Sequence, residues 1–414
     1  MIKNNKSLWK SVKKIIPGGN HLISKRPSLY SKNWPVFYQK ALGCKIKDLE
    51  GRYYYDFSRM AVGCCTLGYS NKEVNNFVKK TINNSNQTSL NSPLEYQLSS
   101  RLLQIEKWSG FVKFAKTGAD INSIAIRIAR AYTNKNIVLI CGYHGWSDWY
   151  ISLAHNSKKN LNKFLLPNIS KLGVPAEFSK YSKSFKYNDI DSFKKLIKKY
   201  RNNIAAVIME PEREERPQED FLNKIRSICT KNKIILIFDE ITSGFRTNFG
   251  GHYNLLNVRP DMVTYGKAIA NGYPITILLG KKKYSKVAEK SFISSTQWSE
   301  NIGVAAAIKT LDIMERNKVQ NKLVAIGEEI KKIWLENSKK YNVDITISGL
   351  GPVLKLQFKK NNKYYMEQFT EIMLKKGFLT GTYFYSSICH MPRLINKYRN
   401  AIDETFYKLM NLKK

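Results

Sequence analysis

The sequence predicts an α/β fold, with a mostly parallel sheet flanked by helices and a smaller α+β domain from the N- and C-terminal parts. Short, continuously apolar runs recur between residues 112 and 279, and amphipathic helical patterns lie between several of them. Such runs are typical of parallel strands whose two faces are both covered by helices. The length of 414 residues is also sufficient for two packed domains.

The elements follow in order along the chain. Residues 1–60 predict an irregular arm and a small hairpin that turns at Glu50 and Gly51. Residues 61–302 form the predicted large domain, and residues 303–414, beginning with a helix to Arg316, form the small domain with which the arm packs. The expected strands are 112–115, 137–141, 204–209, 234–238, 262–265 and 275–279, and the expected helices include 121–132, 191–200 and 221–232.

The composition predicts a globular protein of the cytoplasm. Hydrophobic residues make up 43% of the chain and aromatic residues 12%, which is typical of a chain with a packed core. There is no apolar run of about 18 residues, and the first residues lack the apolar core of a signal peptide. The six cysteines show no CxxC spacing, so we expect reduced thiols, a cytoplasmic location and no membrane partner.

The net charge of +37 raises the question of nucleic-acid binding. Only 15 of the 69 basic residues are arginine, whereas proteins that contact bases and phosphates favour the fork of arginine. The lysines are scattered among asparagines and isoleucines along the whole chain. We therefore expect a solvated, lysine-rich surface and no nucleic-acid partner.

A lysine and an acid after successive strands carry the strongest chemical signal. The apolar run 234–238 ends in Asp239 and Glu240, and Lys267 follows the next predicted strand. Pyridoxal phosphate (PLP) requires such a pair, because a lysine amine binds its aldehyde and a carboxylate pairs with its pyridinium nitrogen. The magnesium site of a P-loop ATPase has an acid in a similar place, but this chain has no G-x-x-x-x-G-K-[ST] loop.

Two further segments follow predicted strands. Thr117 and Gly118 precede a helix, whose N-terminal amides and dipole favour a phosphate, although an ordinary N-cap and turn also explain these residues. Tyr143 offers a flat ring that can stack on a heteroaromatic cofactor. His144 is either a polar neighbour of that ring or a loop histidine with local partners. No second ligand stands near His144 at metal-binding spacing, so we expect no metal.

Six motifs in this order carry a resemblance to a known family. They are Thr117-Gly-Ala-Asp120 with Ile126-Arg-Ile-Ala-Arg130, Tyr143-His-Gly145, Ile208-Met-Glu-Pro211, Asp239-Glu-Ile-Thr-Ser-Gly-Phe-Arg246, Tyr265-Gly-Lys267 and Ser294-Ser-Thr296. Together they resemble the class III aminotransferases, which are PLP enzymes of fold type I. Within that family, the chain looks most like glutamate-1-semialdehyde aminomutase and its relatives, over residues 17–401.

The resemblance implies a role for each matching residue. Lys267 matches the lysine that binds PLP, and Asp239 matches the partner of the pyridine nitrogen, so both are the expected catalytic residues. The remaining expected cofactor contacts are Tyr143, with His144 beside it, on one ring face, Ile241 on the other, Glu210 near the phenolic side, and Thr117, Gly118 and Ala119 around the phosphate. Thr296 matches a hydroxyl that reaches the phosphate of the neighbouring subunit, which implies a homodimer.

The expected substrate pocket departs from the family pattern. Ala119 lacks the hydroxyl that the family usually has in its phosphate cup. Bulky Trp298 stands near the expected substrate entrance, and the charged segment 212–216 replaces small and apolar residues. Lys25 or Arg26 is the candidate for the arginine with which the aminomutase binds its substrate carboxylate.

These features predict a PLP-dependent aminotransferase that moves an amino group from an amino-acid donor, glutamate, to an aldehyde or keto acceptor. The altered entrance favours a sugar-like acceptor. Glutamate-1-semialdehyde 2,1-aminomutase is an alternative, since intramolecular amino transfer uses the same steps. A third hypothesis is a basic, non-catalytic binding protein on the same fold, but it does not explain why Lys267 and Asp239 are both intact.

Overall fold

The computed structural model describes residues 4–156 and 170–412. The chain divides into two compact units. The central unit comprises Phe77–Asp312, and the terminal unit comprises Met1–Asn76 together with Ile313–Lys414. Within the described ranges, every helix is too short or too polar to span a lipid bilayer.

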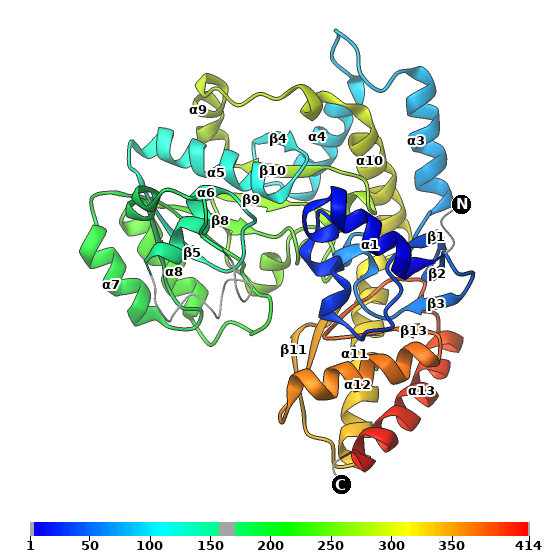
Figure 1. Ribbon diagram of the computed structural model, residues 1–414. Helices are drawn as coiled ribbons and strands as arrows, with labels where there is room; N and C mark the ends of the chain where they lie inside the picture. The colour runs from blue at the N-terminus through cyan, green and yellow to red at the C-terminus, as the bar shows by residue number, and fades with distance from the viewer. Residues whose placement is uncertain (1–3, 157–169, 413–414) are drawn as a thin grey trace. The chain divides into compact units, whose positions relative to one another are not determined.

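The central unit is built on a seven-stranded sheet in the order β4-β10-β9-β8-β7-β5-β6 (Figure 1). Neighbours from β9 to β6 pair in parallel, whereas β10 is antiparallel to both β4 and β9. The strands are β4 (Phe111–Ala115), β5 (Ile137–Cys141), β6 (Ser182–Ser184), β7 (Ile204–Met209), β8 (Ile235–Asp239), β9 (Met262–Tyr265) and β10 (Thr276–Gly280). The mostly parallel sheet and the six strands expected from the sequence are confirmed.

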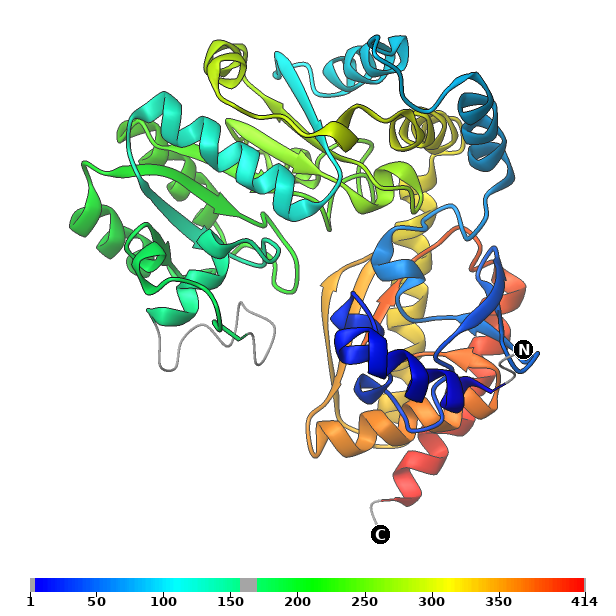
Figure 2. The same cartoon turned by 45° about the horizontal axis from the view of Figure 1, so that its top comes forward.

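Helices cover this sheet, which explains its continuously apolar strands. Every residue of β5, β7 and β8 is buried. The helix α5 (Gly118–Thr133) lies across the sheet (Figures 1 and 2), and its Ile121, Ile124 and Ile128 share a core cluster with Val138 and Ile208. The helix α8 (Phe221–Lys231) packs on β8. Burial of each such side chain contributes about 1.5–3 kcal/mol, so α5 is held firmly at the sheet.

The terminal unit contains two smaller sheets. One has the order β1-β2-β3-β13, and the other has the order β11-β12-β14. The predicted turn at Glu50 and Gly51 joins β2 and β3, and Gly51 adopts the positive φ of 86° that this turn requires. The strands are β1 (Tyr38–Leu42), β2 (Lys45–Asp48), β3 (Tyr53–Asp56), β11 (Ile345–Leu350), β12 (Val353–Phe358), β13 (Phe378–Leu379) and β14 (Tyr383–Tyr385).

The arm that the sequence presented as irregular contains the helix α1 (Asn5–Ile15). The side chain of Asn4 caps it by accepting hydrogen bonds from the amides of Lys6 and Ser7. The other α-helices of the described residues are α2 (Met60–Gly63), α3 (Lys72–Asn84), α4 (Pro93–Ile105), α6 (Asp148–Ile151), α7 (Ile190–Tyr200), α9 (Ser285–Lys290), α10 (Asn301–Arg316), α11 (Val319–Lys340), α12 (Asn362–Lys375) and α13 (Pro392–Asn411).

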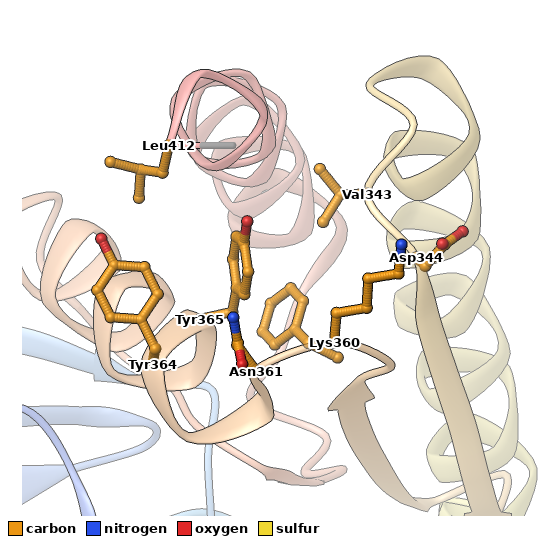
Figure 3. Close-up of a pocket in the computed structure, with 8 residues that line it drawn as sticks. Val343, Asp344, Lys360, Asn361, Tyr364, Tyr365 and Leu412 are labelled. Carbon is orange, nitrogen blue, oxygen red and sulfur yellow. The ribbon is translucent and has the colours of Figure 1, made fainter. Parts of the chain in front are cut away.

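A pocket of about 430 Å³ lies in the terminal unit. Figure 3 shows Tyr364 and Tyr365 of α12 at this pocket, together with Val343 from the loop before β11 and Lys360 from the loop before α12. Its lining contains none of the residues that the sequence assigns to the cofactor.

The stability of the terminal unit is expected to fall as the pH drops from about 6.5 to about 4. His390 is buried, donates from Nε2 to the carbonyl oxygen of Asp56, and accepts the amide hydrogen of Ser387 at Nδ1. Burial lowers the pKa of His390 from 6.5 to about 4. The unfolded state therefore binds more protons in this window, which favours unfolding by about 2 kcal/mol at pH 5.

Urea unfolding at pH 7.5 and pH 5 tests this expectation. The His390→Gln variant is expected to be the less stable protein at pH 7.5, yet to lose about 2 kcal/mol less on acidification because it lacks the titrating imidazole. Equal losses in the two proteins would contradict the assignment to His390.

Candidate active site

The carboxyl ends of four parallel strands bring predicted site residues to one edge of the central sheet. β8 ends at Asp239, β5 is followed by Tyr143 and His144, β7 by Glu210, and β9 by Lys267. The strand register aligns these ends, because the last residues of β5 and β7 are partners and the next strands continue in parallel. Ligands of open α/β sheets bind at this edge.

Three N–H groups surround the carboxylate of Asp239, whose side chain is only 4% exposed. Asn122 Nδ2 donates to Oδ2 at 2.7 Å, and His144 Nδ1 donates to the same oxygen at 2.8 Å. The backbone amide of Ile241 donates to Oδ1 at 3.1 Å. His144 is therefore a partner of the carboxylate and is itself buried. Donors around a buried carboxylate stabilise its charged form.

Glu240, the acid that follows Asp239, binds backbone amides of the protein itself. Its carboxylate accepts the amide hydrogens of His252 at 2.6 Å and Tyr253 at 2.7 Å. Burial raises the pKa of Glu240 to about 7. Asp239 and Glu240 therefore have separate roles, and only Asp239 belongs to the cluster with His144.

Lys267 stands in an uncommon backbone conformation directly after β9. Its φ is 46°, in the left-handed region that a lysine rarely adopts. Its Nζ donates a hydrogen bond of 2.9 Å to Oγ1 of Thr242, which is buried. The preceding Gly266 has little room for a side chain, since a Cβ there would lie 3.0 Å from Thr276. The ammonium group is thus directed by its neighbours rather than free in solvent.

A capping box closes the N-terminus of α5, where the sequence predicts the phosphate cup. The hydroxyl of Thr117 accepts the amide hydrogen of Asp120, and the carboxylate of Asp120 accepts that of Thr117, which forms a capping box. The structure thus shows the ordinary N-cap, and phosphate binding by the first-turn amides stays a prediction. A Cβ on Gly118 would lie 2.9 Å from Ile241, so the absence of a side chain keeps these two segments close.

Tyr143, Glu210 and Arg213 form a second cluster. The amide of Tyr143 donates to Glu210 Oε2 at 3.0 Å, and Arg213 Nη1 donates to the same oxygen at 3.1 Å. The guanidinium also lies 5.8 Å from the centroid of the Tyr143 ring. Gly142 has φ of 110°, and a Cβ there would meet the Glu210 carboxylate at 2.8 Å. A cation and an anion therefore stand together beside the aromatic ring.

The segment after α9 carries the two remaining predictions of this unit. Thr296 is exposed, and its carbonyl oxygen accepts a hydrogen bond of 2.7 Å from Gln87. Trp298 is half-buried and packs against the core of the central unit. Glu300 is buried and forms an ion pair with Lys116, the residue before the phosphate cup. The segment is thus attached to the same strand that leads into α5.

Four partners of the predicted residues escaped the sequence analysis. They are Asn122, Thr264, Thr242 and Arg213. Asn122 had a signal, because a polar residue within the apolar stripe of α5 must find a buried partner. The charged segment 212–216 drew attention to Arg213, but no sequence pattern predicted its contact with Glu210. The predicted Arg26 belongs to the terminal unit, where its guanidinium lies beside Gly18.

The residues at this edge fit a phosphorylated heteroaromatic aldehyde. The helix terminus suits the phosphate, the buried and hydrogen-bonded carboxylate suits a protonated ring nitrogen, and the lysine amine suits the aldehyde. Tyr143 and Ile241 provide flat and apolar surfaces. Gly118 and Gly266 let their backbones approach Ile241 and Thr276 closely, where a Cβ would be crowded.

The comparisons with known proteins show the family to which the chain belongs. The sequence profile of the family "Aminotransferase class-III" matches residues 28–411. The chain is 31% identical over 401 residues to 3-aminobutyryl-CoA aminotransferase of Cloacimonas acidaminovorans (strain Evry), covering 93% of this chain and 91% of that protein. It is 29% identical over 375 residues to glutamate-1-semialdehyde 2,1-aminomutase of Methanosarcina acetivorans, covering 88% and 86%.

Two further proteins extend the comparison. The 2'-deamino-2'-hydroxyneamine transaminase of Streptomyces kanamyceticus is 26% identical over 378 residues, covering 90% of this chain and 92% of the relative. The solved structure of the FumI protein of Sphingopyxis sp. MTA144, in its PLP internal aldimine form, superimposes with a TM-score of 0.90 at 25% identity, covering 98% of this chain and 96% of that one. The chain therefore belongs to the class III aminotransferases, which are PLP-dependent enzymes of fold type I.

Proposed function

We propose that this enzyme transfers an amino group from glutamate to an aldehyde or keto acceptor that carries hydroxyl groups. The observation that carries the proposal is the Glu210–Arg213 pair beside Tyr143. Arginine binds carboxylates through two parallel hydrogen bonds, and a nearby carboxylate can accept from hydroxyl groups. One relative is named for a hydroxylated neamine, which supports an acceptor of this kind.

The proposed roles follow from the chemistry of each side chain. Bound PLP supplies an electron sink for the bond broken at the α-carbon of the donor. Lys267 holds the cofactor through Nζ and, once displaced, takes the α-proton of the donor on the same atom. The carboxylate of Asp239 accepts a hydrogen bond from the protonated ring nitrogen, while Tyr143 and Ile241 pack on the two ring faces.

The phosphate is proposed to bind at the N-terminus of α5, through Thr117, Gly118 and Ala119. Because Ala119 has no hydroxyl, backbone amides and the helix dipole carry more of the binding there. Glu210 is proposed to lie at the phenolic side of the ring, with Arg213 and the half-buried Trp298 contacting the substrate. Arg26 stays a candidate for the substrate carboxylate.

The state of the cysteines supports a location in the cytoplasm. All six cysteines are free thiols, and four of them are buried: Cys44, Cys65, Cys141 and Cys229. Free thiols persist in reducing compartments, and we therefore infer that the enzyme works in the cytoplasm.

A second candidate is the intramolecular aminomutase, because the chain is 29% identical to such an enzyme. The two candidates differ in whether the amino group leaves with a separate product. The loop after Pro211 favours the transferase, because it reads Glu-Arg-Glu-Glu-Arg where the family usually has small and apolar residues.

The visible spectrum of the bound cofactor tests the identity of the amino donor and acceptor. Adding glutamate to the purified holoenzyme is expected to abolish the visible absorption of the lysine-bound cofactor, and a hydroxylated aldehyde or ketone is expected to restore it. The Lys267→Ala variant is expected to lose both responses, because it lacks the amine that binds the aldehyde. The exposed Lys290→Ala serves as the control. Fast turnover of glutamate-1-semialdehyde, with no separate acceptor consumed and no separate aminated product released, would instead establish the aminomutase.

Variants of Arg213 distinguish whether this residue binds the substrate or only neutralises Glu210. Arg213→Met is expected to raise the KM for glutamate by about tenfold or more, since a hydrogen-bonded charge pair is lost. If Arg213 only neutralises Glu210, the Glu210→Gln/Arg213→Met double variant regains a normal KM. If Arg213 binds the donor, the double variant keeps the high KM.

We also infer a homodimer in which Thr296 of the partner subunit completes each phosphate site. The segment is suited to an interface, because Thr296 is exposed and nearby Phe292 is 85% exposed. Sedimentation is expected to give a dimer, and Thr296→Ala is expected to release PLP faster on dialysis while the dimer persists. A fully active monomer would contradict this assembly.

A further inference from the structure

We propose that Asn122 and Thr264 act as a relay that positions Asp239, with Thr264 holding the oxygen end of the Asn122 amide in place. The inference rests on the proposed role of Asp239 toward the cofactor nitrogen. It adds two positioning residues that stand outside the six motifs of the sequence, one on α5 and one on β9.

The relay consists of two buried hydrogen bonds in series. Thr264 Oγ1 donates to Asn122 Oδ1 at 2.9 Å, and Asn122 Nδ2 donates to Asp239 Oδ2 at 2.7 Å. Asn122 and Thr264 are both fully buried, with 0% exposure. Water is therefore absent as a competitor at either link, and each residue depends on the next for its polar contacts.

The strand register explains why these three residues meet. Asp239 on β8 and Thr264 on β9 are direct partners in the parallel pairing. α5 packs across β7, β8, β9 and β10, so a side chain near its first turn can reach both strands. Asn122 occupies that place and contacts both residues. A one-residue shift of β9 would turn Thr264 to the other face of the sheet.

The carboxylate of Asp239 selects one of two orientations of the amide, and the hydroxyl of Thr264 supports the selected one. An asparagine side chain has a donating end and an accepting end of nearly the same shape. Because a carboxylate oxygen only accepts hydrogen bonds, the nitrogen of Asn122 must face Asp239, and the hydroxyl of Thr264 then donates to the Asn122 oxygen. The opposite orientation would set an amide oxygen against a carboxylate oxygen, so two acceptors would meet without a hydrogen between them.

The result is a carboxylate held from two sides. His144 and Asn122 donate to Oδ2 from different elements, and the amide of Ile241 donates to Oδ1. The charged and planar group therefore cannot rotate without breaking a buried hydrogen bond. Loss of the Asn122 donor removes one of these restraints and destabilises the negative charge that pairs with the protonated ring nitrogen.

Isosteric variants of the holoenzyme test the relay. Asn122→Leu is expected to lower kcat by about tenfold, the effect of a lost hydrogen bond to a charged group, and Thr264→Val by about fivefold, the effect of a lost neutral hydrogen bond, with the KM for the donor nearly unchanged in both. Both are expected to shift the visible absorption of the bound cofactor and to speed its loss on dialysis. Thr264→Ser keeps the hydroxyl and is expected to restore all three readouts. Thr310→Val, at another fully buried threonine, is the control for a change of packing.

The double variant gives the decisive comparison. Because Thr264 acts through Asn122, Asn122→Leu/Thr264→Val is expected to match Asn122→Leu alone in spectrum and kcat. Additive losses, an unaltered Thr264→Val, or no rescue by Thr264→Ser would overturn the relay. Asp239→Asn separates this outcome from failure of the proposed function: if that variant keeps the normal spectrum and activity, the role of Asp239 itself is wrong.

Discussion

The parallel register of β7, β8 and β9 is the constraint on which the site depends. It sets Asp239 opposite Thr264 and directs the loops with Glu210 and Lys267 to the same edge of the sheet. The apolar packing of α5 on these strands then carries both the predicted phosphate cup and Asn122 to that edge. Catalytic geometry is thus a consequence of strand pairing and core packing, since none of these residues is brought to the site by a long flexible loop.

The sequence predicted what strong local patterns encode. Continuous apolar runs located the strands of the central sheet, and the run before Asp239 located the acid at a strand end. The hairpin turn at Gly51 followed from a local rule as well. Their common feature is that a few neighbouring residues suffice to specify the structure.

Most of what escaped prediction depends on pairing or on weak local signals. The antiparallel direction of β10 has no local signature, because its apolar run looks like that of its parallel neighbours. β6 is only three residues long and polar. The helix α1 does carry Leu8, Val12 and Ile15 at helical spacing, so its signal was present in the sequence and was missed. The hydrogen bond from Asn122 to Asp239 joins residues 117 positions apart, and no periodicity in a single chain reports such a contact.

The terminal unit takes its strands from both ends of the chain, and this arrangement has a consequence for biosynthesis. β13 pairs in parallel with β3, so Phe378 is the partner of Tyr55. A ribosome delivers the first of these strands long before the second, whereas the central unit is contiguous and can complete its core while synthesis continues. The nascent arm and hairpin must therefore wait with an unpaired edge at β3, which is the kind of surface that invites aggregation or chaperone binding.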